Sequence, residues 1–284
     1  MAPPNFTLSV ATWGNPSSSK NALLIHGLTS VAQTWHRVAR DLAGRGYYVL
    51  APDLPGHGMA GSTQSFTIAA LAEALAPLFS APYPRFDLII AHSLGAVTTL
   101  QLLHILPPFS QHPAAPVNSY TRVLLLDPPL YQSPRTVEMA RTLFMQDVAS
   151  PRSAAQHMSE NPRWTLEDAA WKELGEQLIT PETIDHLFKD NSNWSFVHLL
   201  KLRPATQRSV YLTVLGADPH LKDQKPSFRV EQAQPYLNPR LDSGIVWGAT
   251  HGIHREFPEV VVEHALRRLD ERNAVSSAGE QAKL

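Results

Sequence analysis

Residues 86–96 read Phe86-Asp87-Leu88-Ile89-Ile90-Ala91-His92-Ser93-Leu94-Gly95-Ala96, and they give the strongest structural signal in the chain. An apolar run of strand length leads into a serine and then directly into a helical pattern. The sharp turn between such a strand and helix needs small residues two positions before and after the serine, and Ala91 and Gly95 meet that need. Ser93 would then be exposed at the turn, beside a Leu94 N–H group that can stabilise a negative oxygen. An ordinary N-cap serine is the alternative interpretation.

The composition excludes several classes of function. The chain has 284 residues, 43% hydrophobic and 17% charged, which is enough apolar material for one large core with an inserted subdomain. Its 24 Lys+Arg and 25 Asp+Glu leave a formal charge of −1, so nothing indicates nucleic acid or an anionic membrane as a partner. The absence of cysteine excludes disulfides, thiolate metal sites and a cysteine nucleophile.

Short apolar runs alternate with longer helical patterns, which is typical of βαβ units and a mostly parallel sheet. The predicted strands are Phe6–Ala11, Ala22–His26, Tyr47–Ala51, Asp87–Ala91, Val123–Asp127, Val210–Gly216 and Gly244–Trp247. The predicted helices are Val31–Gly44, Ile68–Phe79, Leu94–Leu106 and Pro258–Arg272. Ligands of such sheets bind outside the carboxyl ends of the strands. The polar residues expected to converge there are His26, Asp53, Ser93, Asp127, Asp218 and His251.

One long segment breaks this alternation. Residues 130–204 hold several amphipathic stretches, divided by Pro151, Pro162 and Pro181, and no convincing strand. We therefore expect residues 1–129 and 205–272 to form the core, with a helical cap at 130–204 inserted late in the sheet. Residues 273–284 are polar and are expected to form a disordered tail.

Two further segments connect the chain to a known family. Leu23-Leu24-Ile25-His26-Gly27-Leu28-Thr29 follows the second predicted strand, and Asp53-Leu54-Pro55-Gly56-His57-Gly58 follows the third. With the serine turn, they make the sequence resemble the α/β-hydrolase family over nearly the whole chain outside the cap. The resemblance implies an oxyanion hole built from the Leu28 and Leu94 N–H groups. It implies structural roles, in loops and turns, for His26, His57 and Asp53.

A serine hydroxyl needs a base, and the base needs an acid to orient it. His251 and His254 both follow the last predicted strand, and the family resemblance favours His251 as the base. Asp218 ends the preceding strand and completes the chain order Ser, Asp, His, so we expect it to be the acid. Asp127, before Pro128-Pro129, is the competitor, because some family members draw their acid from the end of that earlier strand.

The predicted cap is rich in aromatic and basic residues. Its large apolar side chains are expected mainly to pack the cap on the core, with one or two lining an apolar acyl or ring pocket; they are Phe144, Met145, Trp164, Trp171, Phe188, Trp194 and Phe196. Its arginines are expected to form a solvated face rather than to receive an anionic group; they are Arg135, Arg141, Arg152 and Arg163.

These observations predict a serine hydrolase of the carboxylesterase or thioesterase type, with Ser93, Asp218 and His251 as its triad and no metal or organic cofactor. Its substrate is expected to be a small to medium-sized ester, thioester, lactone or related carbonyl compound. One alternative is a cofactor-free dioxygenase or lyase, in which a His251–Asp218 pair takes a proton from the substrate. A second is a non-catalytic ligand-binding relative of such enzymes.

The two ends of the chain give expectations about location. No leader-like or membrane-spanning run is visible, so we expect a soluble, intracellular protein. The last residues, Ala282-Lys283-Leu284, resemble a peroxisomal import signal, with its receptor as a partner; a cytoplasmic location is the alternative.

Overall fold

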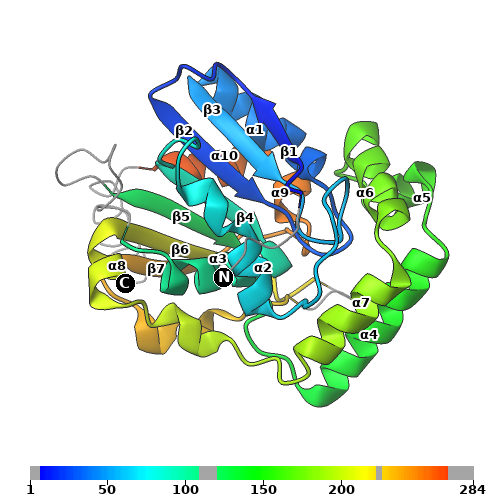
Figure 1. Cartoon of the computed structure of the whole chain (residues 1–284). Coiled ribbons are helices and arrows are strands. Elements are labelled where there is room, and N and C mark those ends of the chain that lie inside the picture. The colour runs from blue at the N-terminus through cyan, green and yellow to red at the C-terminus, as the bar shows by residue number, and fades with distance from the viewer. Residues whose placement is uncertain (1–6, 109–119, 222–225, 268–284) are drawn as a thin grey trace, which may run out of the picture.

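A computed structural model describes residues 7–108, 120–221 and 226–267. These residues contain a seven-stranded sheet in the order β1-β3-β2-β4-β5-β6-β7, in which only β1 is antiparallel to its neighbour. The strands are β1 (Val10–Trp13), β2 (Lys20–Ile25), β3 (Tyr47–Pro52), β4 (Leu88–His92), β5 (Thr121–Leu126), β6 (Val210–Gly216) and β7 (Leu241–Ile245). The sheet is therefore mostly parallel and flanked by helices, as predicted (Figure 1).

The α-helices are α1 (His36–Gly44), α2 (Ile68–Leu75), α3 (Leu94–Ile105), α4 (Pro134–Ala149), α5 (Ala154–Glu160), α6 (Leu166–Leu178), α7 (Pro181–Asp190), α8 (Pro204–Ser209), α9 (Ile253–Glu256) and α10 (Pro258–Leu266). Short 3₁₀ turns are η1 (Ala32–Trp35), η2 (Ala76–Phe79), η4 (Val197–Leu200), η5 (Val230–Gln232) and η6 (Gln234–Tyr236). No helix of the described residues is long and apolar enough to cross a membrane.

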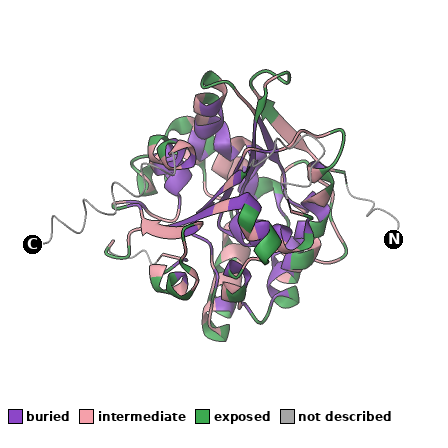
Figure 2. Ribbon diagram, turned by 90° about the vertical axis from the view of Figure 1, so that its left-hand side faces the viewer, coloured by how far each residue is buried: buried purple, intermediate pink, exposed green. Residues whose placement is uncertain are grey.

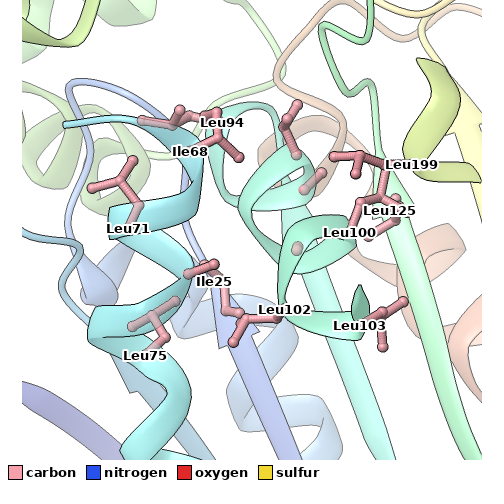
Figure 3. Close-up of a cluster of buried hydrophobic side chains, with 14 of the residues drawn as sticks. Ile25, Ile68, Leu71, Leu75, Leu94, Leu100, Leu102, Leu103, Leu125 and Leu199 are labelled. Carbon is pink, nitrogen blue, oxygen red and sulfur yellow. The ribbon is translucent and has the colours of Figure 1, made fainter. Parts of the chain in front are cut away.

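The central strands are apolar on both faces because helices cover both faces of the sheet. Along β2, Leu23 and Ile25 join the hydrophobic cluster on the side of α2 and α3, whereas Ala22 and Leu24 join the cluster on the side of α1 and α10. Figure 3 shows leucines of α2 and α3 meeting over the sheet, and Figure 2 shows buried strands at the centre of the fold. This packing fixes the ends of the strands, where the site lies.

The predicted strands all form, with shifted ends. The first was expected from Phe6, which lies outside the described residues, and β1 runs from Val10 to Trp13. The last begins at Leu241 rather than Gly244, since pairing with β6 recruits the polar stretch Leu-Asp-Ser that has no apolar run of its own. The helix predicted to Arg272 ends at Leu266 in the described part.

The segment between β5 and β6 contains α4 to α7, which pack as the pairs α4–α7 and α5–α6 (Figure 1). Each helix starts at a serine or threonine whose side-chain oxygen accepts an N–H group of the first turn, which explains where it begins; these caps are Ser133, Ser153, Thr165 and Thr180. The interpretation of this segment as a cap stays a prediction. The predicted tail, 273–284, lies outside the described residues.

The inserted helices are fixed to the core at two places. On α7, Asp190 accepts the N–H of Phe66, and Asn191, the residue after the helix, accepts that of Ile68 at the start of α2. On α6, Glu167 accepts two hydrogen bonds from Arg40 of α1. Helices α6 and α7 therefore sit in fixed positions over the carboxyl ends of the strands.

Candidate active site

Ser93 joins β4 to α3 in a strained backbone conformation, with φ 53° and ψ −119°. Such a conformation is rare for a residue with a side chain and requires close support from its surroundings. A Cβ on Gly95 would lie 2.3 Å from the His26 carbonyl oxygen, and one on Gly27 would lie 2.9 Å from the Ser93 Cβ. The small residues that the sequence places around the serine are thus required by close backbone packing.

His251 lies against Ser93. The distance from its Nε2 to the Ser93 Oγ is 3.0 Å, and its Nδ1 lies 2.6 Å from the Asp127 Oδ2. A carboxylate only accepts hydrogen bonds, so Nδ1 carries the proton and Nε2 is left to accept the serine hydroxyl. The three side chains therefore form one hydrogen-bonded chain in which Ser93 can lose its proton to the imidazole.

Asp127 follows β5 directly and is completely buried, with φ 44°. Its carboxylate accepts the N–H groups of Ala217 at 3.3 Å, Ser227 at 2.9 Å and Phe228 at 2.9 Å. These donors satisfy a buried charge that would otherwise be costly. They also fix the carboxylate in the position that orients the His251 ring.

Asp218 was predicted to be the acid, and in the structure this prediction is wrong. Its carboxylate accepts the N–H groups of His220 at 2.8 Å and Gly248 at 2.9 Å, and Asp127 takes the place beside His251. These backbone hydrogen bonds stabilise the charged form and lower the pKa of Asp218. Asp218 is the second residue after β6, and from there its carboxylate accepts the Gly248 N–H of the loop after β7.

The register between β4 and β5 explains why Asp127, rather than Asp218, contacts His251. His92 of β4 pairs with Leu126 of β5, so the next residue of each strand, Ser93 and Asp127, lie side by side where the strands end. Because β5 is the neighbour of β4, an aspartate directly after β5 is well placed to contact the histidine that faces Ser93. The family order Ser, Asp, His is satisfied by either aspartate and could not distinguish them.

His254, the competitor for the base, points away from the serine. Its Nε2 lies 3.2 Å from the Thr34 Oγ1, and its ring packs 4.6 Å from the ring of Trp35. Burial lowers its pKa well below the usual value, so it stays neutral. The structure gives it a place in the core and brings His251 alone of the two to Ser93.

His26 holds the loop that follows β2. The Leu54 N–H donates to its Nε2 at 3.0 Å, so the proton of the neutral ring is on Nδ1, which donates to the Gly27 carbonyl at 2.8 Å. Burial lowers the pKa of His26 and keeps it neutral. Fixing the Gly27 carbonyl also fixes the Leu28 N–H, because both belong to one planar peptide. Leu94 opens α3, where N–H groups lack partners within the helix.

The other polar residues of this region form turns, as their predicted structural roles require. Asp53 accepts the N–H groups of Ala32 at 2.7 Å and Met59 at 3.0 Å. His57 donates from Nδ1 to the Pro55 carbonyl at 2.9 Å, and burial lowers its pKa to about 3. Neither residue contacts Ser93 or His251 through these hydrogen bonds.

His92 is a residue of the site that the sequence reasoning missed. Its Nε2 donates to the His251 carbonyl at 2.7 Å, and the two rings lie 4.6 Å apart. Burial lowers its pKa well below the usual value, so the neutral ring acts as a fixed donor. It ties the loop that carries His251 to the strand that leads into Ser93. No sequence pattern signals this contact, which joins residues 159 positions apart.

Among residues 7–108, 120–221 and 226–267, no group of three or more histidine, aspartate or glutamate side chains is arranged to hold a metal ion.

The fold and the hydrogen-bonded triad define the class of the protein. A model of the alpha/beta hydrolase family matches residues 22–264, and the chain belongs to this family. It is 26% identical over 253 residues to Lipase LipV of Mycobacterium tuberculosis, covering 80% of this chain and 93% of that protein.

Solved structures share the fold. E-2-(acetamidomethylene)succinate hydrolase superposes with a TM-score of 0.68 at 16% identity, covering 93% of this chain and 96% of that one. A thermophilic esterase from Thermogutta terrifontis superposes with a TM-score of 0.63 at 18% identity, covering 90% of each chain.

Proposed function

We propose that the protein is a serine hydrolase that cleaves carboxylic esters or thioesters through an acyl-enzyme on Ser93. The observation that carries this proposal is the chain of hydrogen bonds from Ser93 through His251 to Asp127, at 3.0 and 2.6 Å. Membership of the alpha/beta hydrolase family, which includes similar proteins named lipase and esterase, supports it.

In the first half-reaction, the Ser93 Oγ attacks the substrate carbonyl carbon while its proton passes to the His251 Nε2. Asp127 stabilises the imidazolium, and the Leu28 and Leu94 N–H groups donate to the oxyanion. The tetrahedral intermediate then collapses, and the leaving alcohol or thiol takes the proton from His251.

In the second half-reaction, a water molecule attacks the acyl carbonyl and gives its proton to His251. The carboxylic acid departs, and Ser93 regains the proton. His251 and Asp127 return to their starting states, so the cycle balances with water as the only co-substrate.

Covalent labelling tests the proposal. A fluorophosphonate probe should modify the wild-type protein at Ser93, and Ser93→Ala should abolish both labelling and hydrolysis of p-nitrophenyl esters. If Ser93→Ala retained most of the hydrolysis, a mechanism in which His251 acts as a base without an acyl-enzyme on Ser93 would replace the proposal. A His251–Asp218 pair is disfavoured for such a mechanism, because Asp127 occupies the place beside His251. Tight ligand binding without labelling or turnover would indicate a binding protein.

The proposed substrate has an apolar acyl or ring portion. The segment between β5 and β6 places buried aromatic residues over the core, among them Trp164, just before α6, and Phe188 of α7. A series of p-nitrophenyl esters of increasing acyl length tests this point. A rise in kcat/KM from acetate to longer acyl chains would support an apolar acyl site, and a steady fall would contradict it.

The import signal predicted at Ala282-Lys283-Leu284 lies outside the described residues. We propose it as a peroxisomal address that is tested in cells. A fluorescent fusion should leave peroxisomes when the three residues are removed, and an unchanged location would refute the proposal.

A further inference from the structure

Lys172 reaches from α6 into the loop that follows β2. Its Nζ donates to the Thr29 carbonyl at 3.1 Å and to the Thr29 Oγ1 at 2.5 Å. The lysine side chain is 15% exposed, so these contacts are sheltered from water. Thr29 directly follows Leu28, the residue whose N–H group is proposed to bind the oxyanion.

The hydrogen bonds continue from Thr29 to the Leu28 carbonyl. An ammonium only donates, so the Thr29 hydroxyl accepts from Lys172 and gives its own proton to the Leu28 carbonyl at 2.8 Å. Thr29 is completely buried with φ 54°, a conformation that a β-branched residue adopts only when its surroundings impose it. Lys172 supplies two of the contacts that hold this strained turn.

Helix α6 is anchored so that the lysine stays in place. A Cβ on Gly175 would lie 2.8 Å from the Thr29 carbonyl oxygen, so the helix touches the loop backbone directly. Glu176, with a fully buried side chain, lies 3.1 Å from the Lys172 Nζ and accepts from the His157 ring at 3.1 Å. The pair α5–α6 and the loop thus form one packed unit.

A second buried cation holds the next residue of the loop. Arg255 of α9, close in sequence to His251, donates to the Ser30 Oγ at 3.0 Å and lies 4.7 Å from the ring of Trp164. Buried cations are costly, and apolar side chains of similar size often replace them without loss of stability. Stability alone is therefore a weak explanation for two cations aimed at one loop.

We propose that Lys172 is a positioning residue, whose ammonium holds the Leu28–Thr29 turn so that the Leu28 N–H faces the oxyanion. This inference rests on the proposed function, since it concerns the same reaction. It makes turnover depend on the inserted helices, because the lysine that orders the turn belongs to α6. Lys172 acts through Thr29 and does not touch the reacting atoms.

The principal test compares Lys172→Met with wild type, using p-nitrophenyl esters and a boronic acid that forms a tetrahedral adduct on Ser93. We expect kcat to fall about 10- to 100-fold, as for the partial loss of an oxyanion donor, with KM changed by less than about threefold. The boronic acid should lose affinity by about the same factor as kcat/KM. Lys189→Met, on the exposed side of α7, is the matched control and should change neither value.

Paired variants of Thr29 keep the proposal testable if Lys172→Met does not fold. Thr29→Val keeps the shape and removes the hydroxyl, whereas Thr29→Ser keeps the hydroxyl. Thr29→Val should lose kcat and boronic acid affinity together, and Thr29→Ser should lose little of either. Equal losses in the two variants would overturn the proposal.

The pH dependence is a second readout. Burial outweighs the attraction of Glu176 and lowers the pKa of Lys172 to about 8; Asp147 of α4 adds attraction, and Arg255 of α9 adds repulsion. His57, also in this region, stays neutral. Because the neutral amine is a weaker donor, wild-type kcat should fall as the pH rises through about 8. Lys172→Arg keeps its charge and should not show this fall.

The outcomes separate the two proposals. Wild-type protein that neither reacts with a fluorophosphonate nor turns over esters would refute the proposed function. Active wild-type protein beside a folded Lys172→Met that keeps kcat and boronic acid affinity within about twofold would refute the role of Lys172 alone.

Discussion

Two loops of this protein each place an aspartate just after a parallel strand, and they use it differently. After β5, Asp127 turns at once into a left-handed conformation, is fully buried, and contacts His251 at 2.6 Å. After β6, Asp218 stands two residues further along and closes a turn by accepting backbone N–H groups. Both strand ends bring a carboxylate close to the site. The backbone conformation directly after the strand decides whether that carboxylate reaches His251.

The largest expected effect separates the two aspartates by activity. Asp127→Asn should lower kcat by about 10⁴, because an amide can donate to Nδ1 and favours the wrong tautomer of His251. Asp218→Asn should lower kcat by less than about tenfold, because it affects only a turn. Steady-state kinetics on p-nitrophenyl esters measures both. Equal losses in the two variants would contradict the distinction between the loops.

A smaller effect is expected from moving one of the N–H groups that hold the Asp127 carboxylate. A Cβ on Gly216 would lie 3.2 Å from the Phe228 Cδ1 and 3.3 Å from its carbonyl oxygen, and the Phe228 N–H binds Asp127. Gly216→Ala should therefore shift this donor, lowering stability by about 1 to 2 kcal/mol and kcat by several fold. Denaturant unfolding and kinetics on one preparation give both values.

Gly244 of β7 is the matched control for Gly216. Its added Cβ would meet the Leu215 Cδ2 at 3.5 Å, an ordinary contact. Gly244→Ala should leave kcat unchanged and raise stability by up to about 1 kcal/mol, since glycine weakens a strand interior. A loss of activity in this variant as large as in Gly216→Ala would show that the sheet edge, rather than the support of Asp127, is at fault.

The smallest effect concerns the pH dependence of stability. The hydrogen bonds from Gly248 and His220 lower the pKa of Asp218 below 3.8 in the folded protein. The stabilisation they give is present above pH 3.8 and is lost as the pH falls through the lowered value. Asp218→Asn should show a shallower loss of stability below pH 4 than wild type, as measured by thermal melting. A curve as steep as that of wild type would contradict this role.

Much of the fold could be predicted from the sequence because local patterns encode it. The apolar runs of β2 and β4 are needed because both faces of these strands are buried. The small residues around Ser93 are needed because backbone atoms lie close to them. Such requirements are visible in the residues themselves. The first strand, the last strand and the helix after Pro258 were displaced, because their ends depend on pairing and packing with distant residues.

The site was predicted less completely. Ser93 and His251 follow from their places after β4 and β7, and the structure brings them to 3.0 Å. The acid was assigned to Asp218 because the sequence shows neither the left-handed turn of Asp127 nor the three N–H groups that hold it. His92 and Lys172 were missed for a related reason, since each acts through a backbone carbonyl on a distant element.

Proton NMR of the His251 ring tests directly whether Asp127 orients the imidazole that faces Ser93. A short hydrogen bond to a carboxylate deshields the Nδ1 proton strongly, so wild-type protein should show a resonance far downfield. That resonance should persist in Asp218→Asn and disappear in Asp127→Asn. If the resonance instead disappeared in Asp218→Asn and persisted in Asp127→Asn, Asp218 rather than Asp127 would be the partner of His251.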